Sequence, residues 1–431
     1  MDKYQGTRIA GRDELGGVSL PGEVQLALDD LAGSVREGLL ALSVGVGLKV
    51  LDELLEEELV ELVGPKGKHN PERSAGRHGS RRGQVVLGGR KVQVRRPRAR
   101  TREGRELALQ TYAHFASDDL LCERTVQTML AGLSTRRHRR ALEPTGVEGR
   151  SVSKSAVSRR FVARTRRSLA ELMARPVPDD LVVLMLDGVV LAGSTCLCAL
   201  AIRADGTKVP LGLWEGASEN AAVCRRALAD LAERGLSAER GLLVVIDGSK
   251  ALRKAVGEAL GAKAAIQRCR RHKEQNVLGH LPEFERPWVK GKLREAWAQE
   301  RADLAERRLQ ELARALEAKR PGAATSLREG VAETLTITHL GVHADSTLGR
   351  TLATTNPIES MLSICRERAR NVKRWRGGEM ALRWTAAGML DAERSFRRVK
   401  GFRGLGQLAT ALRRHAADVD GEEVRDFPTA A

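Results

Sequence analysis

Three carboxylates stand where a folded chain could bring them together for metal-assisted phosphoryl transfer. Asp187 lies inside an apolar run, LMLDGVV, and a carboxylate buried in such a run must be paired or must bind a cation. Asp247 ends a second apolar run, VVIDGSKAL. Glu359 falls in the first turn of a helix that Thr355 or Asn356 can cap. Such hard oxygen ligands suit Mg²⁺ or Mn²⁺, and we expect two ions, roughly 3.5–4 Å apart.

Each carboxylate also has a simpler explanation. Asp-Gly after an apolar run is ordinary turn chemistry, and for Asp247 alone that explanation suffices. It does not account for Asp187, because apolar residues continue from 189 to 191. Glu359 could merely complement the dipole of its helix. Against this, the helix of Glu359 is the one that would pack back on the sheet.

The bulk composition favours a polyanionic partner. The 431 residues carry a formal charge of +18 and a pI near 10.2, which makes nucleic acid the leading partner. A solvated surface rich in arginine is the alternative. No apolar run approaches the roughly 20 residues of a membrane span, and MDKYQGTRIAGRDE lacks a signal-peptide core, so we expect a cytoplasmic, nucleoid-associated protein. The six cysteines include no CxxC pair and are interpreted as reduced.

An α/β core is expected around the first two carboxylates. The apolar runs predict the order β-β-β-α-β-α-β, in which the first three strands form an antiparallel meander. A ribonuclease H-like domain has this order and a mixed five-stranded sheet, with the Asp187 and Asp247 strands adjacent and parallel. The expected elements are strands at Leu181–Leu191, Cys196–Arg203, Lys208–Trp214, Gly241–Ile246 and Ala264–Gln267, with helices at Ser218–Arg234 and Ser249–Leu260.

The region 1–176 is predicted to be a mainly helical DNA-binding region that also contains a β-hairpin. An amphipathic helix over 51–62 is followed by a polar stretch, 64–83, which resembles a linker or a DNA-ordered arm. A hairpin follows around Gly88-Gly89. Its second strand continues into a basic segment with little acid between its cations, which favours phosphate contact. The predicted DNA-binding residues here are Arg95, Arg96, Arg98 and Arg100.

A helix-turn-helix pattern ends this region. A short basic helix over 134–142 precedes a longer one that Ser153 can cap. Its inward residues would be Val157, Phe161, Leu169 and Leu172, and its outward cations Lys154, Arg159, Arg160 and Arg164. Ordinary helical bundles share this pattern, so DNA reading stays one of two interpretations. The Pro176-Val177-Pro178 segment marks a boundary.

The remaining chain divides by pattern into a core and additions to it. The core is expected over 179–282, an all-helical insertion over 283–350, the helix with the third carboxylate over 351–371, and a basic helical region over 372–431. Trp214, on a strand, is expected in the core. Trp288 and Trp297, in the insertion, are the better candidates for stacking on unpaired bases.

Four stretches together resemble bacterial insertion-sequence transposases of the Mutator type: QRCRRHKEQNVL, VVIDGSKAL, WEGASEN with LAERGL, and TTNPIES. The resemblance covers about residues 182–373. It implies a ribonuclease H-like catalytic domain of the DDE type, whose acidic triad falls on Asp187, Asp247 and Glu359. It also implies action on terminal inverted repeats and target DNA by a homodimer or higher multimer.

Cys269 and His272 match the Cys-x-x-His signature of that family. Two ligands are too few for structural zinc, so we place both at the edge of the active site and expect His272 to position a phosphate or the attacking water. Family members often have an aromatic residue between them, where this chain has two arginines. Those arginines and the basic run after the third carboxylate predict further DNA contacts at Arg270, Arg271, Arg370, Lys373 and Arg374.

Two other functions compete with DNA transposition. A non-catalytic DNA-binding regulator would explain the charge, but not three carboxylates at strand and helix ends. A structure-specific nuclease of the same fold would need neither the helical insertion nor the long N-terminal region. Short inverted repeats flanking the gene would favour the transposase over both.

Overall fold

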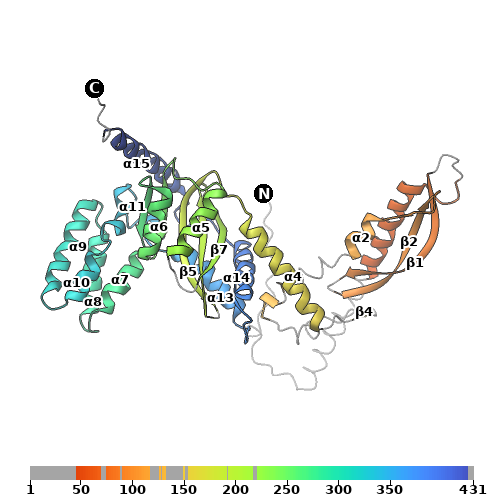
Figure 1. The fold of residues 1–431 in the computed structure, drawn as a ribbon, viewed down its shortest axis with the longest axis horizontal. Coiled ribbons are helices and arrows are strands. Elements are labelled where there is room, and N and C mark those ends of the chain that lie inside the picture. Colours follow the sequence, from red (N-terminus) through yellow and green to blue (C-terminus); the bar gives the residue numbers. More distant parts are fainter. Residues whose placement is uncertain are drawn as a thin grey trace, which may run out of the picture. The chain divides into compact units, whose positions relative to one another are not determined.

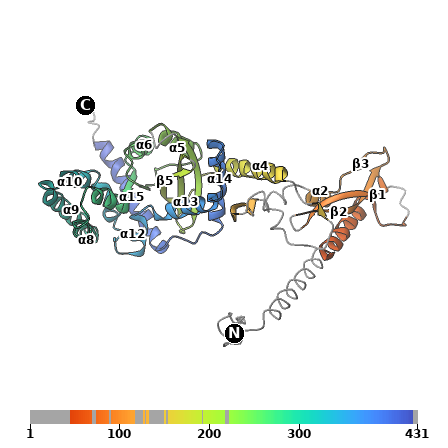
Figure 2. The ribbon, with the colours of Figure 1, turned by 90° about the horizontal axis from the view of Figure 1, so that it is seen from below.

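The computed structural model describes residues 45–68, 74–87, 90–116, 126–127, 129–132, 149–150, 154–191, 193–216 and 221–425. The chain divides into two compact units, the first made of residues 1–127 and 133–160 and the second of residues 128–132 and 161–431. Figures 1 and 2 show the elements of both. The short basic helix predicted over 134–142 lies outside the described residues, as do the predicted helix caps Ser153 and Ser218.

A helix over residues 45–63 and a long β-hairpin form the first unit. The hairpin consists of β1 (Ala75–Leu87) and β2 (Arg90–Thr101), and the short strands β3 (Glu106–Leu107) and β4 (Gly149–Arg150) pair with β2. Leucines recur at every fourth position of the helix, so one helix face is apolar and packs on the hairpin. Its core contains Leu51, Leu55, Leu59, Val63, Val85 and Ala99.

The predicted hairpin is confirmed, but it is longer than its apolar residues indicated. β1 begins at Ala75, inside the polar stretch predicted as a linker or a DNA-ordered arm, so the linker interpretation is wrong for residues 75–83. The stretch lacks apolar alternation because arginine and glycine fill it. Pairing with β2 from Ala75 opposite Thr101 onward nevertheless satisfies its backbone N–H and C=O groups.

The second unit is built on a mixed five-stranded sheet with the order β7-β6-β5-β8-β9. The first three strands in the chain are antiparallel neighbours, while β8 pairs in parallel with β5 and with β9. This confirms the predicted strand order and the parallel neighbours. The strands are β5 (Leu181–Leu191), β6 (Ser194–Arg203), β7 (Lys208–Gly216), β8 (Leu242–Ile246) and β9 (Ala264–Arg268).

Helices cover the sheet, and their packing shows to which face each strand side chain points. α5 (Ala221–Glu233) and α6 (Lys250–Leu260) share a core with Leu184 and Leu186 of β5. Because strand side chains alternate between faces, the residue after Leu186 points to the opposite face. α13 (Asn356–Ala369) packs against β5, and Figure 2 shows the two side by side. α14 (Gly378–Glu393) packs against α13 and β7.

The long helix α4 (Lys154–Met173) joins the second unit from Phe161 onward. The ring of Phe161 lies 4.7 Å from that of Trp384 in α14, and Arg383 donates a 3.0 Å hydrogen bond to Thr165. Val157, Phe161 and Leu172 are buried as predicted, whereas Leu169 is half-buried. The predicted boundary near residue 176 therefore follows a helix that already packs within this unit.

The predicted helical insertion consists of helices with a core of their own. α8 (Arg286–Trp297), α9 (Ala302–Glu317) and α10 (Pro321–Arg328) bury leucines and alanines against one another. α7 (Arg270–Gly279) leads into this part, and α11 (Thr336–His339) and α12 (Thr347–Leu352) lead back to α13. The helix α15 (Leu405–Arg425) follows in the C-terminal region.

The structure corrects one of the tryptophan predictions. Trp214 is buried, as expected for a core residue. Trp297 is buried as well, and its Nε1 donates to the hydroxyl of Thr334, so it is not free to stack on a base. Trp288 has half of its surface exposed and stays a stacking candidate. Among the described residues, no helix is long and apolar enough to cross a membrane.

Candidate active site

Asp187 is the buried carboxylate of the site. It lies within β5 on the face opposite Leu186, which is the side that α13 covers. Only 8% of its surface is exposed. Its Oδ1 accepts a 2.8 Å hydrogen bond from the backbone N–H of Gly188. This one bond to a neutral donor leaves most of the carboxylate's capacity to bind a cation or a hydrogen-bond donor unused.

Asp247 follows β8 directly. Leu186 and Ile246 are register partners on the parallel strands β5 and β8, so the next residue on each strand is an aspartate. Parallel strands end at the same edge of a sheet, which brings these two carboxylates to neighbouring positions. Asp247 Oδ1 accepts a 2.9 Å bond from the N–H of Ser249, and Ser249 caps α6, the helix predicted to begin at this residue.

Gly248 allows the sharp turn after Asp247. Its φ of +112° is one that side chains with a Cβ rarely adopt. A Cβ added at Gly248 would lie 2.4 Å from Nε of Arg268, the last residue of β9. Glycine is therefore required at this position by the backbone conformation, and a Cβ would in addition crowd the Arg268 side chain. The Asp-Gly pair can therefore form a turn and still place the Asp247 carboxylate at the candidate site.

Glu359 enters the site from α13. Pro357 lies in the first turn, and Thr355 is the N-cap residue by position. The Thr355 side chain makes no capping bond; its hydroxyl donates to Glu359 Oε1 at 2.5 Å. Glu359 is half-buried. The helical insertion lies between β9 and α13, so the third carboxylate comes after the insertion in the chain.

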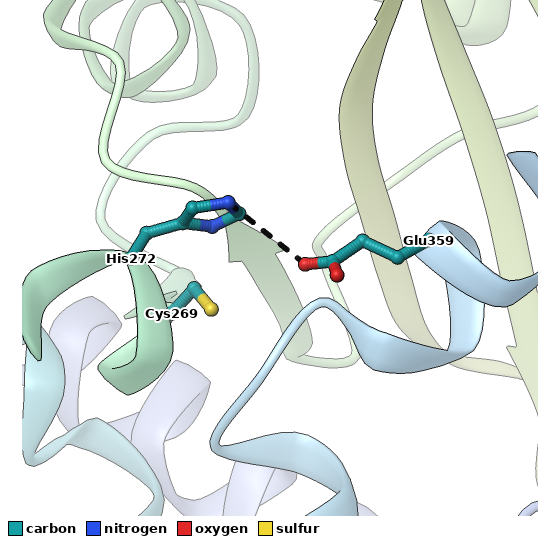
Figure 3. Close-up of side chains that lie close together, drawn as sticks. All are labelled: Cys269, His272 and Glu359. Atoms are coloured by element: carbon teal, nitrogen blue, oxygen red, sulfur yellow. Dashed lines mark ion pairs between the residues drawn. The ribbon is translucent and has the colours of Figure 1, made fainter. Parts of the chain in front are cut away.

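Cys269 and His272 lie at the same edge, at the start of α7. Cys269 follows β9 directly, and its N–H donates to the carbonyl of Ile246 at 2.8 Å. His272 Nε2 lies 3.9 Å from Glu359 Oε1. The ligand atoms of Cys269, His272 and Glu359 all lie within 4.8 Å of one another (Figure 3).

Burial and the neighbouring carboxylates together set the pKa of Asp187. The pKa of Asp187 is raised from 3.8 to about 7, chiefly by burial and also by the nearby Asp247 and Glu359, while the Gly188 N–H and His272 act in the opposite sense. Cys269, followed by the carboxylates of Asp187 and Glu359, raises the pKa of His272 to about 9 despite partial burial. His272 therefore carries a positive charge at neutral pH.

Two sets of residues could hold a metal ion, and they share Glu359. Asp187, Asp247 and Glu359 supply only carboxylate oxygens, which suit Mg²⁺ or Mn²⁺. Cys269, His272 and Glu359 could hold a softer ion such as Zn²⁺. Burial alone would raise the pKa of the Cys269 thiol, but hydrogen bonding, chiefly with His272, lowers it overall.

The predicted DNA-binding arginines between Cys269 and His272 differ in their surroundings. Arg270 is buried; its guanidinium donates to the carbonyls of Thr334 and Trp297 and to the hydroxyl of Thr338. The prediction that it contacts DNA is therefore wrong, because it instead anchors the insertion to the start of α7. Arg271 is exposed, and so are Arg370, Lys373 and Arg374 after α13.

The remaining predicted cations lie on α4 and in the first unit. Arg159 is exposed and Arg160 half-buried, while the side chain of Lys154 lies outside the described residues. Arg95 is exposed. Arg96, Arg98 and Arg100 are half-buried, and the first two of these lie beside Glu106. The sequence predictions missed the contact between Thr355 and Glu359.

A family model described as "Transposase, Mutator family" matches residues 30–398. The transposase for insertion sequence element ISRM5 of Rhizobium meliloti (strain 1021) is 29% identical over 263 residues, which cover 60% of this chain and 64% of that protein. The transposase for insertion sequence element IS6120 of Mycolicibacterium smegmatis is 30% identical over 251 residues, which cover 57% of this chain and 75% of that protein. The transposase for insertion sequence element IST2 of Acidithiobacillus ferrooxidans is 31% identical over 177 residues, which cover 41% of this chain and 58% of that protein. The chain thus spans less than two thirds of the IST2 and ISRM5 relatives.

The raised pKa of Asp187 predicts a pH dependence of stability in metal-free protein. The folded state holds the Asp187 proton up to about pH 7, whereas an unfolded aspartate loses it near 3.8, so stability falls as pH rises through this window. Asp187→Asn cannot ionise. Its free energy of unfolding relative to wild type should rise between pH 5 and pH 8 by about 3 kcal/mol, because about two pH units of the window lie above pH 5 and each corresponds to about 1.4 kcal/mol.

The measurement is urea unfolding in the presence of EDTA at several pH values. Asp205→Asn is the matched control with the opposite sign, because hydrogen bonds from Thr207 lower the pKa of Asp205. That variant should lose stability relative to wild type at neutral pH, and the difference should shrink in acid. A wild-type to Asp187→Asn difference that does not change with pH would contradict the account.

Proposed function

This chain belongs to the Mutator family of transposases, and on that premise we propose that it cleaves and joins DNA at the ends of an insertion sequence. The proposed substrates are terminal inverted repeats and target DNA, bound by a homodimer or higher multimer at the nucleoid. The proposed catalytic core is a ribonuclease H-like domain of the DDE type. Asp187, Asp247 and Glu359 are its proposed metal ligands.

The convergence of three carboxylates from separate elements carries this proposal. β5, β8 and α13 supply one each, and the pKa of the buried Asp187 responds to both of the others. Two Mg²⁺ or Mn²⁺ ions, when bound, would activate an attacking hydroxyl and stabilise the charge on a leaving 3′ oxygen. β8 and α13 both lie against β5 in the folded protein, which supports a site that needs little reorganisation at the moment of reaction.

We assign His272 to positioning within this site. Its protonated ring, 3.9 Å from Glu359, is suited to hold a phosphate oxygen or to orient the attacking water beside the carboxylates. Nε2 of His272 faces Glu359, whereas Nδ1 is buried and has no hydrogen-bond partner among the described residues. A histidine in this role donates hydrogen bonds, which a zinc-bound nitrogen cannot do.

The hairpin of the first unit is the proposed site of end-DNA binding. Arg82 pairs with Arg95 across the two strands, and Arg81 pairs with Arg96. Like charges directly opposite each other repel, so these pairs cost stability unless a polyanion neutralises them. A hollow of about 600 Å³ beside Gln93 is lined by Arg81, Arg82 and Arg95. Phosphates of a DNA backbone would relieve the repulsion.

Further contacts to DNA are proposed for exposed cations of the second unit. Arg271 lies one residue from His272, and its Nη1 is 3.4 Å from the side chain of Asn356 at the start of α13. Arg370, Lys373 and Arg374 follow the C-terminal end of the same helix. These positions surround the helix that carries Glu359, where a bound strand would have to pass. Arg159 on α4 is a further proposed contact.

Removing any one carboxylate of the triad should abolish both DNA cleavage and strand transfer. Asp187→Asn, Asp247→Asn and Glu359→Gln each remove a charge with little change of shape. Each should slow both steps by about a hundred- to a thousandfold or more while leaving the affinity for end DNA near the wild-type value. Assays on labelled inverted-repeat DNA in Mg²⁺, beside binding measurements, provide the readouts.

Glu367→Gln is the control, because Glu367 is exposed on the same helix two turns beyond Glu359. It should behave as wild type. Cleavage at the wild-type rate by any of the three triad variants would remove that residue from the triad.

Loss of charge on the hairpin should weaken end-DNA binding and its salt dependence together. Replacing Arg81, Arg82 and Arg95 by Gln should reduce the slope of log Kobs against log salt by about three, one for each arginine that neutralises a phosphate in the wild-type complex. Folding should be unaffected or improved, since a repulsive cluster is removed. Fluorescence anisotropy with end DNA at several salt concentrations measures the slope.

A control variant removes the same charge elsewhere: Lys292→Gln, Arg308→Gln and Lys319→Gln, all exposed in the insertion. Its salt slope should stay closer to wild type than that of the hairpin variant. Equal slopes for the two triple variants would rule out the hairpin as the principal end-binding element.

A further inference from the structure

Thr355 is a buried hydroxyl directly beside the proposed metal ligand Glu359. None of its surface is exposed to solvent. Its Oγ1 donates to Glu359 Oε1 at 2.5 Å and also lies 3.5 Å from Sγ of Cys269. A threonine hydroxyl has one proton, and the shorter contact with the charged acceptor takes it. The thiol of Cys269 then lies beside the hydroxyl oxygen as a weak S–H donor, which favours the orientation in which the hydroxyl proton points to the carboxylate.

The backbone holds Thr355 and Cys269 in this arrangement. The N–H of Cys269 donates to Ile246, the residue before Asp247, and the N–H of Arg270 donates to Ala353 at 2.8 Å. The turn before α13 is thereby tied to the end of β9. In addition, the N–H of Glu359 donates to the Thr355 carbonyl at 2.9 Å, so the main chains of the two residues are also linked.

The bond from Thr355 leaves half of the carboxylate available. Both Thr355 and His272 approach Glu359 through Oε1. Oε2 takes part in no hydrogen bond or ion pair with the residues that the structure describes. A glutamate side chain has several rotatable bonds, and a fixed Oε1 removes much of that freedom before a cation binds.

We propose that Thr355 is a positioning residue that fixes the rotamer of Glu359, with Cys269 as the support that orients the Thr355 hydroxyl. This inference rests on the proposed function, in which Glu359 is a metal ligand. It gives the cysteine of the Cys-x-x-His pair a role that needs no metal: its thiol acts through Thr355, and the histidine faces the carboxylate directly.

The test compares Thr355→Val, which keeps the shape and removes the hydroxyl, with Thr355→Ser, which keeps the hydroxyl. Full-length protein bound to end DNA is titrated with Mn²⁺, and free Mn²⁺ is followed by electron paramagnetic resonance. Thr355→Val should weaken Mn²⁺ binding and slow cleavage by about 10- to 100-fold, the usual effect of removing a partner of a metal ligand. Thr355→Ser should stay within about threefold of wild type on both, as expected if the hydroxyl itself carries the effect.

Thr354→Val is the matched control, because that hydroxyl only accepts a 3.4 Å bond from the N–H of Asn356. It should bind Mn²⁺ as wild type does. Cys269→Ala should give a smaller loss than Thr355→Val, and the double variant should be no worse than Thr355→Val, since the two residues act in series. Thr355→Ala replaces the valine variant if the latter does not fold.

Two failures can be told apart. If Glu359→Gln cleaves normally, the proposed triad fails, whatever Thr355 does. If Glu359→Gln is inactive but Thr355→Val binds Mn²⁺ and cleaves as wild type, only the positioning role fails. Equal losses in Thr355→Val and Thr355→Ser would also overturn that role, because packing rather than the hydroxyl would then be responsible.

Discussion

A carboxylate inside an apolar strand is the constraint on which the rest of this structure depends. Asp187 is nearly enclosed, and burial raises its pKa to about 7. Ionising it without a cation is costly, because a buried charge loses its hydration. Asp247 and Glu359 also contribute to the raised pKa, whereas the N–H of Gly188 and the ring of His272 oppose it. Such an arrangement is unfavourable for an isolated protein and favourable for one that binds divalent cations.

The architecture around the site brings distant parts of the chain to this one carboxylate. The parallel register of β5 and β8 puts Asp247 beside Asp187, and α13 brings Glu359 over the same face. Between β9 and α13 the chain forms a helical insertion with its own core. The buried guanidinium of Arg270 donates to Thr334 and Thr338, which fixes the segment before α13 against the start of α7. Precision at the site therefore depends on polar anchors as well as on apolar packing.

Much of this arrangement could be predicted from the sequence, for identifiable reasons. The apolar runs predict the strands. Asp187 is conspicuous within its run because burying an unpaired charge among apolar residues is unfavourable. Arg270 was mispredicted because a sequence shows an arginine without showing the carbonyls that surround it in the fold. β1 was mispredicted in part because its residues are polar, and pairing partners cannot be read from composition. The role of Thr355 depends on a contact with Cys269, 86 residues away, that only the fold creates.

The most direct test of the central claim is to locate the metal ions. Crystals of the protein bound to end DNA, grown with Mn²⁺ and measured at the manganese absorption edge, would give anomalous peaks at the ions themselves. The account predicts two peaks roughly 3.5–4 Å apart, within coordination distance of Asp187, Asp247 and Glu359. A single peak bound by Cys269, His272 and Glu359 with Asp187 left without a metal, above all one identified as zinc at its own edge, would contradict it.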